Sequence, residues 1–286
     1  MKLAVCLLVL CLSTMASAVS VRDDAGATIV LAQSARRVIT LTPHATELVA
    51  AIAPQALVAV DKFSDYPALV TRLPRIGDYA ALNTEAIVAL KPDLVISWEG
   101  EANDAATRRL RELGIVVFNS RPDSVEAIAS NLERLATLLG EPQRGQALAR
   151  EQRAQLAALR AQYTKARSVR VFLQLGERPM YTVSDRAFLG RSLKDCGAHN
   201  LYGADAATVP IASLEAVLQF QPEVILVNGP AELLQGWQRF GKLSAVASRR
   251  VFRLHGDALV RPGPRFVGAM AQLCRWVDSA RAGKLP

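Results

Sequence analysis

The sequence predicts an α/β protein of two similar lobes, each built on a central parallel sheet and joined by one long backbone helix. Hydrophobic residues make up 51% of the chain and charged residues 21%, which is typical of a globular protein with a sizeable core. One pattern of acidic residue, short apolar helix, proline, acidic residue and apolar strand occurs twice, at 85–96 and at 215–226. Because this unit recurs in both halves of the chain, we interpret the halves as two similarly built lobes.

The N-terminus has the features of a secretory signal peptide over 1–18. Lys2 precedes an apolar run at 3–12, and Ala16 and Ala18 form a cleavage-type ending. The run is too short to span a bilayer as a finished helix. We therefore expect cleavage near Ala18 and an exported, soluble mature protein without a lipid anchor.

The mature chain is expected to divide into an N-terminal lobe over 19–139, a connecting helix over 140–167 and a C-terminal lobe over 168–286. In the first lobe, Pro92 stops the first repeat helix, because the residue before proline resists helical geometry. The elements expected there are a hairpin at 19–31, strands at 37–41, 57–60, 94–98 and 115–118, and helices at 46–52, 83–91 and 105–113.

The two lobes are linked by a helical region over 124–166 that Gly140-Glu141-Pro142 divides in two. Its second half has roughly 25 residues and would be about 37 Å long at the helical rise. In the second lobe we expect strands at 169–174, 224–227 and 251–254, an extended segment at 180–183, and helices at 188–196, 213–221, 237–243 and 265–281.

The formal net charge of +8 fits either a nucleic-acid surface or a solvated basic surface. Neighbouring arginines occur as pairs, at 36–37, 108–109 and 249–250, without interleaved aromatic residues. The solvated surface is the better interpretation, and we expect no nucleic-acid partner.

Two cysteines, Cys196 and Cys274, remain once the leader is removed. In an oxidising compartment an isolated pair is most simply a disulfide. Two buried free thiols and metal ligation are the alternatives.

The sequence contains none of the common catalytic signatures, neither His-Glu-x-x-His, nor a glycine-rich phosphate loop, nor Gly-x-Ser-x-Gly. We therefore expect no enzymatic activity, no cofactor and no resident metal. His44, His255 and Asp257 could meet between the lobes as metal ligands, and they motivate a secreted metal-dependent hydrolase as an alternative.

Aromatic residues lie where open α/β sheets bind ligands. Phe63, Tyr79 and Trp98 fall just after or between strands of the first lobe, and Tyr181 follows the first strand of the second. Each one alone also fits a capping core aromatic. Four at corresponding edges predict an apolar cleft for a large flat ligand.

Each copy of the repeat opens on a glutamate, Glu85 or Glu215, at the start of a helix. A carboxylate there stabilises the helix dipole by roughly 0.3 to 1 kcal/mol. Placed symmetrically on two lobes, the pair would also form a two-pronged negative contact for arginines of a partner.

Four segments carry a family resemblance: Phe63-Ser64-Asp65-Tyr66-Pro67, Gly77-Asp78-Tyr79, Leu82-Asn83 through Glu85 to Ile96-Ser97-Trp98, and Val171-Phe172-Leu173-Gln174. In this order they closely resemble the periplasmic cobalamin-binding proteins of bacterial vitamin B12 importers. That family belongs to the helical-backbone class of ABC-transporter substrate-binding proteins. The resemblance covers nearly all of the chain from Arg37.

The resemblance implies a periplasmic monomer that carries cobalamin, or a related corrinoid, as its transported ligand between the lobes. It implies that Glu85 and Glu215 meet arginines of an ABC-transporter permease dimer, and that Cys196 pairs with Cys274. The residues that it places at the ligand are Phe63, Tyr79, Trp98, Tyr181, Asp257 and Arg261.

The chain departs from the family at three positions. Val209 and Ala258 stand where tryptophan is usual, which leaves less aromatic cover on the second lobe and leaves the preferred corrinoid open. His44 replaces a small polar residue near the cleft, where it either approaches the cobalt or serves the helix entry. A receptor for haem or a ferric siderophore on the same fold is the alternative function.

Overall fold

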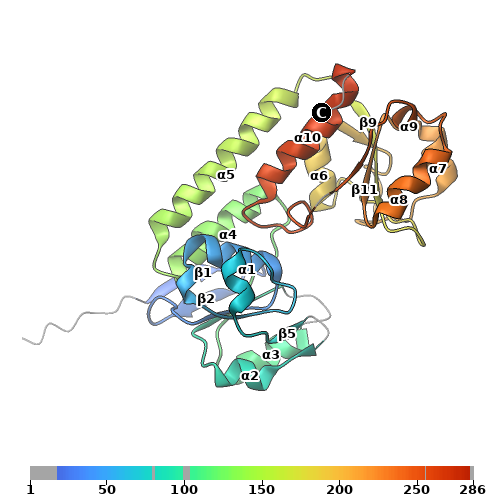
Figure 1. Cartoon of the computed structure of the whole chain (residues 1–286). Helices are drawn as coiled ribbons and strands as arrows, with labels where there is room; N and C mark the ends of the chain where they lie inside the picture. The colour runs from blue at the N-terminus through green and yellow to red at the C-terminus, as the bar shows by residue number, and fades with distance from the viewer. Residues whose placement is uncertain (1–17, 79–80, 99–103, 255, 284–286) are drawn as a thin grey trace, which may run out of the picture.

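Two four-stranded parallel sheets form the centres of two lobes in the computed structural model, which describes residues 18–78, 81–98, 104–254 and 256–283 (Figure 1). The strand order is β4-β3-β7-β8 in the first lobe and β10-β9-β11-β12 in the second. Numbered within its own lobe, each order reads second, first, third, fourth. The lobes therefore share one topology, and the predicted α/β fold class is confirmed.

The N-terminal lobe surrounds its sheet with short helices and two hairpins. Its first helix begins at Pro43 rather than at the expected Thr46, because proline has a fixed φ that suits the first helical position and lacks only an N–H that would have no helical partner there. The sheet strands are β3 (Val38–Thr40), β4 (Leu57–Val60), β7 (Leu94–Ser97) and β8 (Val117–Asn119). The hairpins are β1 (Val19–Arg22) with β2 (Thr28–Leu31) and β5 (Gly77–Asp78) with β6 (Ala81–Leu82), and the helices are α1 (Pro43–Ile52), α2 (Thr84–Ala89), α3 (Asp104–Glu112) and the 3-10 turns η1 (Pro54–Ala56) and η2 (Ala68–Arg72).

The C-terminal lobe has the same plan with three elements that the sequence pattern did not predict, the edge strand β10 and the helices α8 and α9. The helix expected at 237–243 is only a 3-10 turn at 237–239. Its strands are β9 (Val169–Leu175), β10 (Ala198–Asn200), β11 (Val224–Asn228) and β12 (Val251–Arg253). Its helices are α6 (Phe188–Asp195), α7 (Leu214–Phe220), α8 (Ala231–Gly236), α9 (Ser244–Ala247), α10 (Phe266–Ala282) and the 3-10 turn η3 (Trp237–Arg239). The segment expected to be extended at 180–183 makes only isolated bridges, from Tyr181 to Leu175 and Ile211.

A helical strut runs along one side of both lobes (Figure 1). It consists of α5 (Pro142–Tyr163), which packs against α4 (Val125–Leu138) of the first lobe. Gly145 allows the close approach, because a Cβ at this position would lie 2.2 Å from the Cβ of Ala136. Toward the second lobe, Arg160 of α5 pairs with Asp195 at 2.9 Å.

The repeated sequence occupies the same structural position in both lobes. In each, a helix with the glutamate in its first turn leads into the third strand of the sheet, α2 into β7 and α7 into β11. Asn83 and Ser213 cap these helices by accepting the N–H groups of Ala86 and Ala216. The duplication inferred from sequence is therefore a duplication of the lobe.

The two mature cysteines form the predicted disulfide. Cys196, just after α6, is bonded to Cys274 of α10, with 4.9 Å between their Cα atoms. Both residues are fully buried. The bond therefore holds two helices of the C-terminal lobe together. None of the helices in the described part of the chain combines the length and apolar composition that a membrane crossing requires.

Candidate functional site

Three of the four predicted ligand aromatics lie at the carboxyl ends of the parallel strands with large exposed surfaces. Phe63 follows β4 and is 48% exposed, Trp98 follows β7 and is 36% exposed, and Tyr181 follows β9 and is 38% exposed. In open α/β sheets, ligands bind outside this edge, where the strand order reverses. Exposed aromatic rings at this edge of both lobes form surfaces suited to a flat apolar ligand.

Trp98 packs against His44, which comes from the first turn of α1. The two rings meet edge to face, with 5.1 Å between centroids and 87° between planes. His44 Nε2 lies 3.0 Å from the backbone oxygen of Ser120, which only accepts, so Nε2 carries the proton. Nδ1 then accepts from the Thr42 hydroxyl at 3.0 Å.

Burial lowers the pKa of His44 to about 4, so the imidazole is neutral at neutral pH. Both of its ring nitrogens are engaged by Thr42 and Ser120 of the same lobe. His44 is thus a buried residue at the helix entry, with both ring nitrogens turned to partners within its own lobe.

The loop that carries Phe63 is held by buried polar contacts. Asp61, which is 2% exposed, accepts the backbone N–H of Phe63 at 2.9 Å and also accepts the hydroxyl of Ser64. Ser64 in turn contacts the hydroxyl of Thr46 at 2.6 Å, and Thr46 that of Thr40 at 2.6 Å. Burial raises the pKa of Asp61, and the hydrogen bonds from Ser64 and Phe63 oppose that rise.

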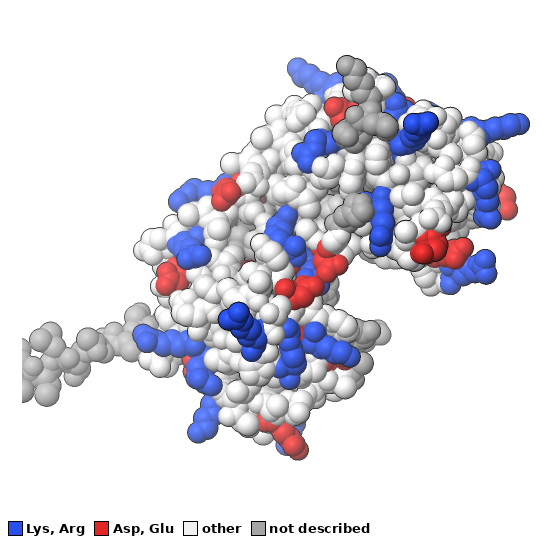
Figure 2. Space-filling model, in the orientation of Figure 1, with Lys and Arg blue, Asp and Glu red and all other residues white. Residues whose placement is uncertain are grey.

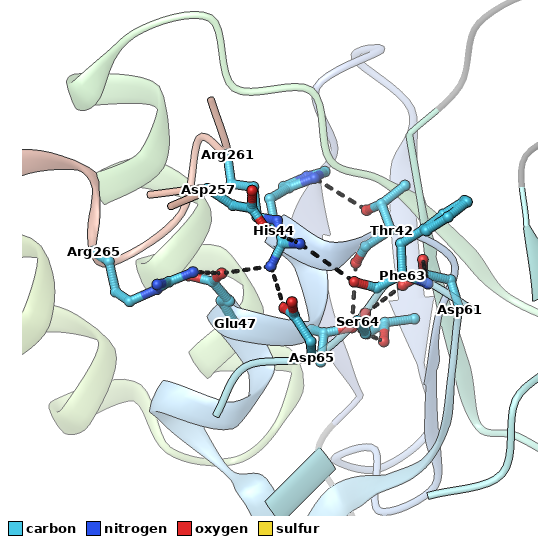
Figure 3. Close-up of polar contacts among 12 residues, drawn as sticks. Thr42, His44, Glu47, Asp61, Phe63, Ser64, Asp65, Asp257, Arg261 and Arg265 are labelled. Atoms are coloured by element: carbon cyan, nitrogen blue, oxygen red, sulfur yellow. Dashed lines mark hydrogen bonds and ion pairs between the residues drawn. The ribbon is translucent and has the colours of Figure 1, made fainter. Parts of the chain in front are cut away.

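Arg261 and Asp257 lie in the segment before α10 and form an ion pair with each other at 2.5 Å. Arg261 also crosses to the first lobe, where it pairs with Asp65 at 2.5 Å and with Glu47 at 3.6 Å (Figure 3). Its Nη2 also donates to the backbone oxygen of Phe63 at 3.4 Å. Arg261 therefore joins the second lobe to the loop of Phe63.

A second arginine completes this contact between the lobes. Arg265 donates to both carboxylate oxygens of Glu47, at 2.9 and 2.5 Å, and its guanidinium stacks 4.0 Å from the ring centroid of Tyr66. Hydrogen bonding to Glu47 raises the pKa of Arg265. We call Glu47, Asp65, Asp257, Arg261 and Arg265 the inter-lobe cluster.

Oppositely charged side chains gather where the two lobes meet, beside the hollow between the lobes (Figure 2). Glu47 is the most buried of the inter-lobe cluster, with 2% of its side chain exposed, whereas 64% of Asp65 and 47% of Asp257 are exposed. The cluster thus has a buried anchor on α1 and an exposed acidic edge.

Other predicted site residues are not joined to this group. Tyr181 stands on the second lobe, where it forms a bridge to the exposed Ile211. Tyr79 lies outside the described residues, as do His255 of the hydrolase alternative and residues 1–17 of the leader. Within the described residues, no three His, Cys, Asp or Glu side chains come together in a way that could hold a metal ion.

The two repeat glutamates are exposed in the first turns of α2 and α7, one on each lobe. Their helices are capped by Asn83 and Ser213, so neither glutamate side chain is needed as the cap. This leaves both carboxylates available to a partner.

Sequence reasoning missed Glu47, Arg265 and the contact of Asp65. Asp65 lies in a quoted motif, yet its partner Arg261 stands 196 positions away, a separation that periodicity does not detect. Glu47 did carry a signal, since it is a lone acidic residue among the buried positions of α1.

Comparison with known proteins places the chain among bacterial periplasmic binding proteins. Residues 38–258 match the family described as periplasmic binding protein. A vitamin B12-binding protein of Vibrio parahaemolyticus is 35% identical over 248 residues, which cover 86% of this chain and 90% of that protein. A vitamin B12-binding protein of Yersinia pestis is 34% identical, covering 87% and 88%.

Solved structures agree with this placement. The periplasmic vitamin B12-binding protein BtuF of Vibrio cholerae matches with a TM-score of 0.77 and 35% identity, over 86% of this chain and 98% of that one. The periplasmic haem-binding protein RhuT of Roseiflexus matches with a TM-score of 0.76 and 25% identity, over 86% and 99%. With its two lobes, its parallel sheets and a family match over most of its length, the chain belongs to the periplasmic binding protein family.

Proposed function

We propose that this protein captures cobalamin or a related corrinoid between its lobes and delivers it to an ABC-transporter permease in the inner membrane. The observation that carries the proposal is the set of exposed aromatic rings, Phe63 and Trp98 on one lobe and Tyr181 on the other, at the strand ends. The names of the relatives that share 34 to 35% of the sequence over most of the chain support the same ligand.

The geometry suits binding rather than turnover. The lobes are joined by α5 and by the inter-lobe cluster, so little ordering is needed when a ligand arrives. We infer that Phe63, Tyr79, Trp98 and Tyr181 contact the faces and edges of the corrin, and that Asp257 and Arg261 reach its amides. Catalysis has no part in this function.

Titration of the purified mature protein tests the ligand. Calorimetry with cyanocobalamin and with dicyanocobinamide should give one site per chain, and the bound corrinoid should show a shifted visible spectrum. If neither corrinoid gives a heat of binding or a spectral change, the proposal is contradicted.

A haem receptor is the second candidate, because the haem-binding protein RhuT shares the fold at 25% identity. Competition separates the two. Haem that displaces bound cyanocobalamin at equal concentration would favour the haem receptor, whereas retention of cyanocobalamin supports the corrinoid receptor.

We further propose that residues 1–18 direct export and are removed, so that the mature protein works in the periplasm as a monomer. Mass spectrometry of the protein recovered from the periplasm should give an N-terminus near Val19. An intact N-terminus on the exported protein would contradict cleavage.

A further inference from the structure

The inter-lobe cluster does not balance its own charge. Three carboxylates, of Glu47, Asp65 and Asp257, meet two guanidiniums, of Arg261 and Arg265. The hydrogen bond from Arg261 lowers the pKa of Asp65, which keeps this exposed carboxylate ionised at neutral pH. The cluster therefore carries a net charge of one negative unit.

The charged groups next to the cluster do not change this balance. Arg75 donates to the backbone oxygens of Asp61 and Ser64 and so lies close to the Asp61 carboxylate. Lys62 pairs with Asp78 at 3.7 Å. Arg75 and Asp61 form one pair of opposite charges, and Lys62 and Asp78 form another.

The exposure of each side chain in the inter-lobe cluster decides whether a ligand meets positive or negative charge first. The Arg261 side chain is 14% exposed and Glu47 only 2%, while Asp65 is 64% exposed. Asp257, at 47%, is also largely open. The two most exposed side chains of the cluster are therefore carboxylates, ahead of Arg265 at 30%, and the cluster is tied to the loop of Phe63 by the hydrogen bond from Arg261 to its backbone oxygen.

We propose that Asp65 and Asp257 make the cleft selective for a flat ligand whose periphery bears neutral amides rather than carboxylates. This inference rests on the proposed function, since it concerns the same cleft. Amide N–H groups donate to carboxylates, whereas a ligand carboxylate near the acidic edge meets like charge at a partly desolvated site. Corrinoids with amide side chains would be accepted, and porphyrins with propionates disfavoured.

Two kinds of ligand of nearly the same shape isolate the effect of one negative charge on the ligand. Cyanocobalamin is compared with its monocarboxylic acids, in which one peripheral amide has been hydrolysed to a carboxylate. Each isomer is titrated at neutral pH into the full mature protein and into Asp65→Asn and Asp257→Asn. Asparagine keeps the size and one acceptor oxygen while removing the charge.

For the wild type we expect at least one isomer to bind about tenfold or more weakly than cyanocobalamin, as one unit charge near a protein surface would produce. In Asp65→Asn or Asp257→Asn, the ratio of the dissociation constant of the monocarboxylic acid to that of cyanocobalamin should shrink to within about threefold. The reason is that the cluster has become neutral. Glu151→Gln is the control, since it removes one exposed negative charge on α5 and should leave the ratio as in the wild type.

The outcomes separate this inference from the function on which it rests. If cyanocobalamin itself does not bind, the proposed function fails. If cyanocobalamin and every monocarboxylic acid bind the wild type equally, the selectivity is overturned while the receptor function stands. A ratio that persists unchanged in both asparagine variants, with their melting temperatures near that of the wild type, also overturns the role of the two aspartates.

Discussion

His44 is a buried neutral histidine that supports the edge of Trp98. Its pKa is lowered by burial to about 4, so the folded protein takes up a proton at this site only as the pH approaches 4. An unfolded chain protonates the same side chain near its ordinary pKa of 6.5. Between these two values the unfolded state binds more protons, and stability falls as the pH falls.

We expect the wild type to lose about 2 kcal/mol of its free energy of unfolding between pH 7 and pH 5 through His44 alone. His44→Asn removes the titrating group, so its stability should fall less over the same interval. Urea unfolding followed by circular dichroism at both pH values measures the difference. Equal losses in the two proteins would contradict a depressed pKa at this site.

Trp98 is the partly exposed aromatic whose ring contacts His44. Trp98→Ala should weaken cyanocobalamin binding by about tenfold or more, the order expected for an aromatic anchor in a binding site. Leu113→Ala is the control, because it truncates another exposed apolar residue, beyond the end of α3. An unchanged dissociation constant for Trp98→Ala would remove this ring from the binding surface.

At the scale of elements, the contact between α4 and α5 depends on a glycine. A Cβ at Gly145 would come within 2.2 Å of Ala136 Cβ and 2.6 Å of the Leu132 backbone oxygen. Gly268 is also helical, in α10, but is exposed and has no atom within 4 Å of such a Cβ. The same substitution should therefore act in opposite directions at the two positions.

Gly145→Ala should destabilise the protein by about 1–3 kcal/mol through overpacking. Gly268→Ala should stabilise it by up to about 1 kcal/mol, because alanine has the higher helix propensity. Thermal unfolding of both variants beside the wild type measures the two signs. A stabilised Gly145→Ala would mean that α4 and α5 separate easily, and the strut would then be less rigid than proposed.

At the scale of the whole molecule, the duplicated lobe places one exposed glutamate on each half. Figure 1 shows α2 and α7 on different lobes, both away from α5, so a partner that contacts both helices must span the two lobes. A membrane permease made of two similar subunits would fit such a pair.

The double variant Glu85→Ala with Glu215→Ala should bind cyanocobalamin as the wild type does and lose delivery, measured as uptake in cells that carry the cognate importer. Glu141→Ala with Glu151→Ala removes the same charge at the start and along the length of α5, and uptake should persist. Loss of cyanocobalamin binding in the first double variant would assign the glutamates to the cleft instead.

Much of this fold follows from local sequence. Pro92 and Pro222 each separate a short capped helix from an apolar strand, and apolar continuity marks the buried strands, so the lobe repeat could be predicted. The edge strand β10 could not, because its residues Ala198-His199-Asn200 have no apolar pattern. Pairing with β9 is what makes this segment a strand.

For the candidate site, sequence determined the types and rough positions of the residues. The aromatic residues after the strands and the glutamates at the helix starts could be chosen because strand ends and helix starts are local features. Tertiary structure decided their surroundings. Arg261 meets Asp65, and Arg265 meets Glu47, only because the segments that carry them belong to two lobes that a common strut joins. Charge pairs between distant segments leave no periodic signal, since their energy depends on distance in space and not on separation along the chain.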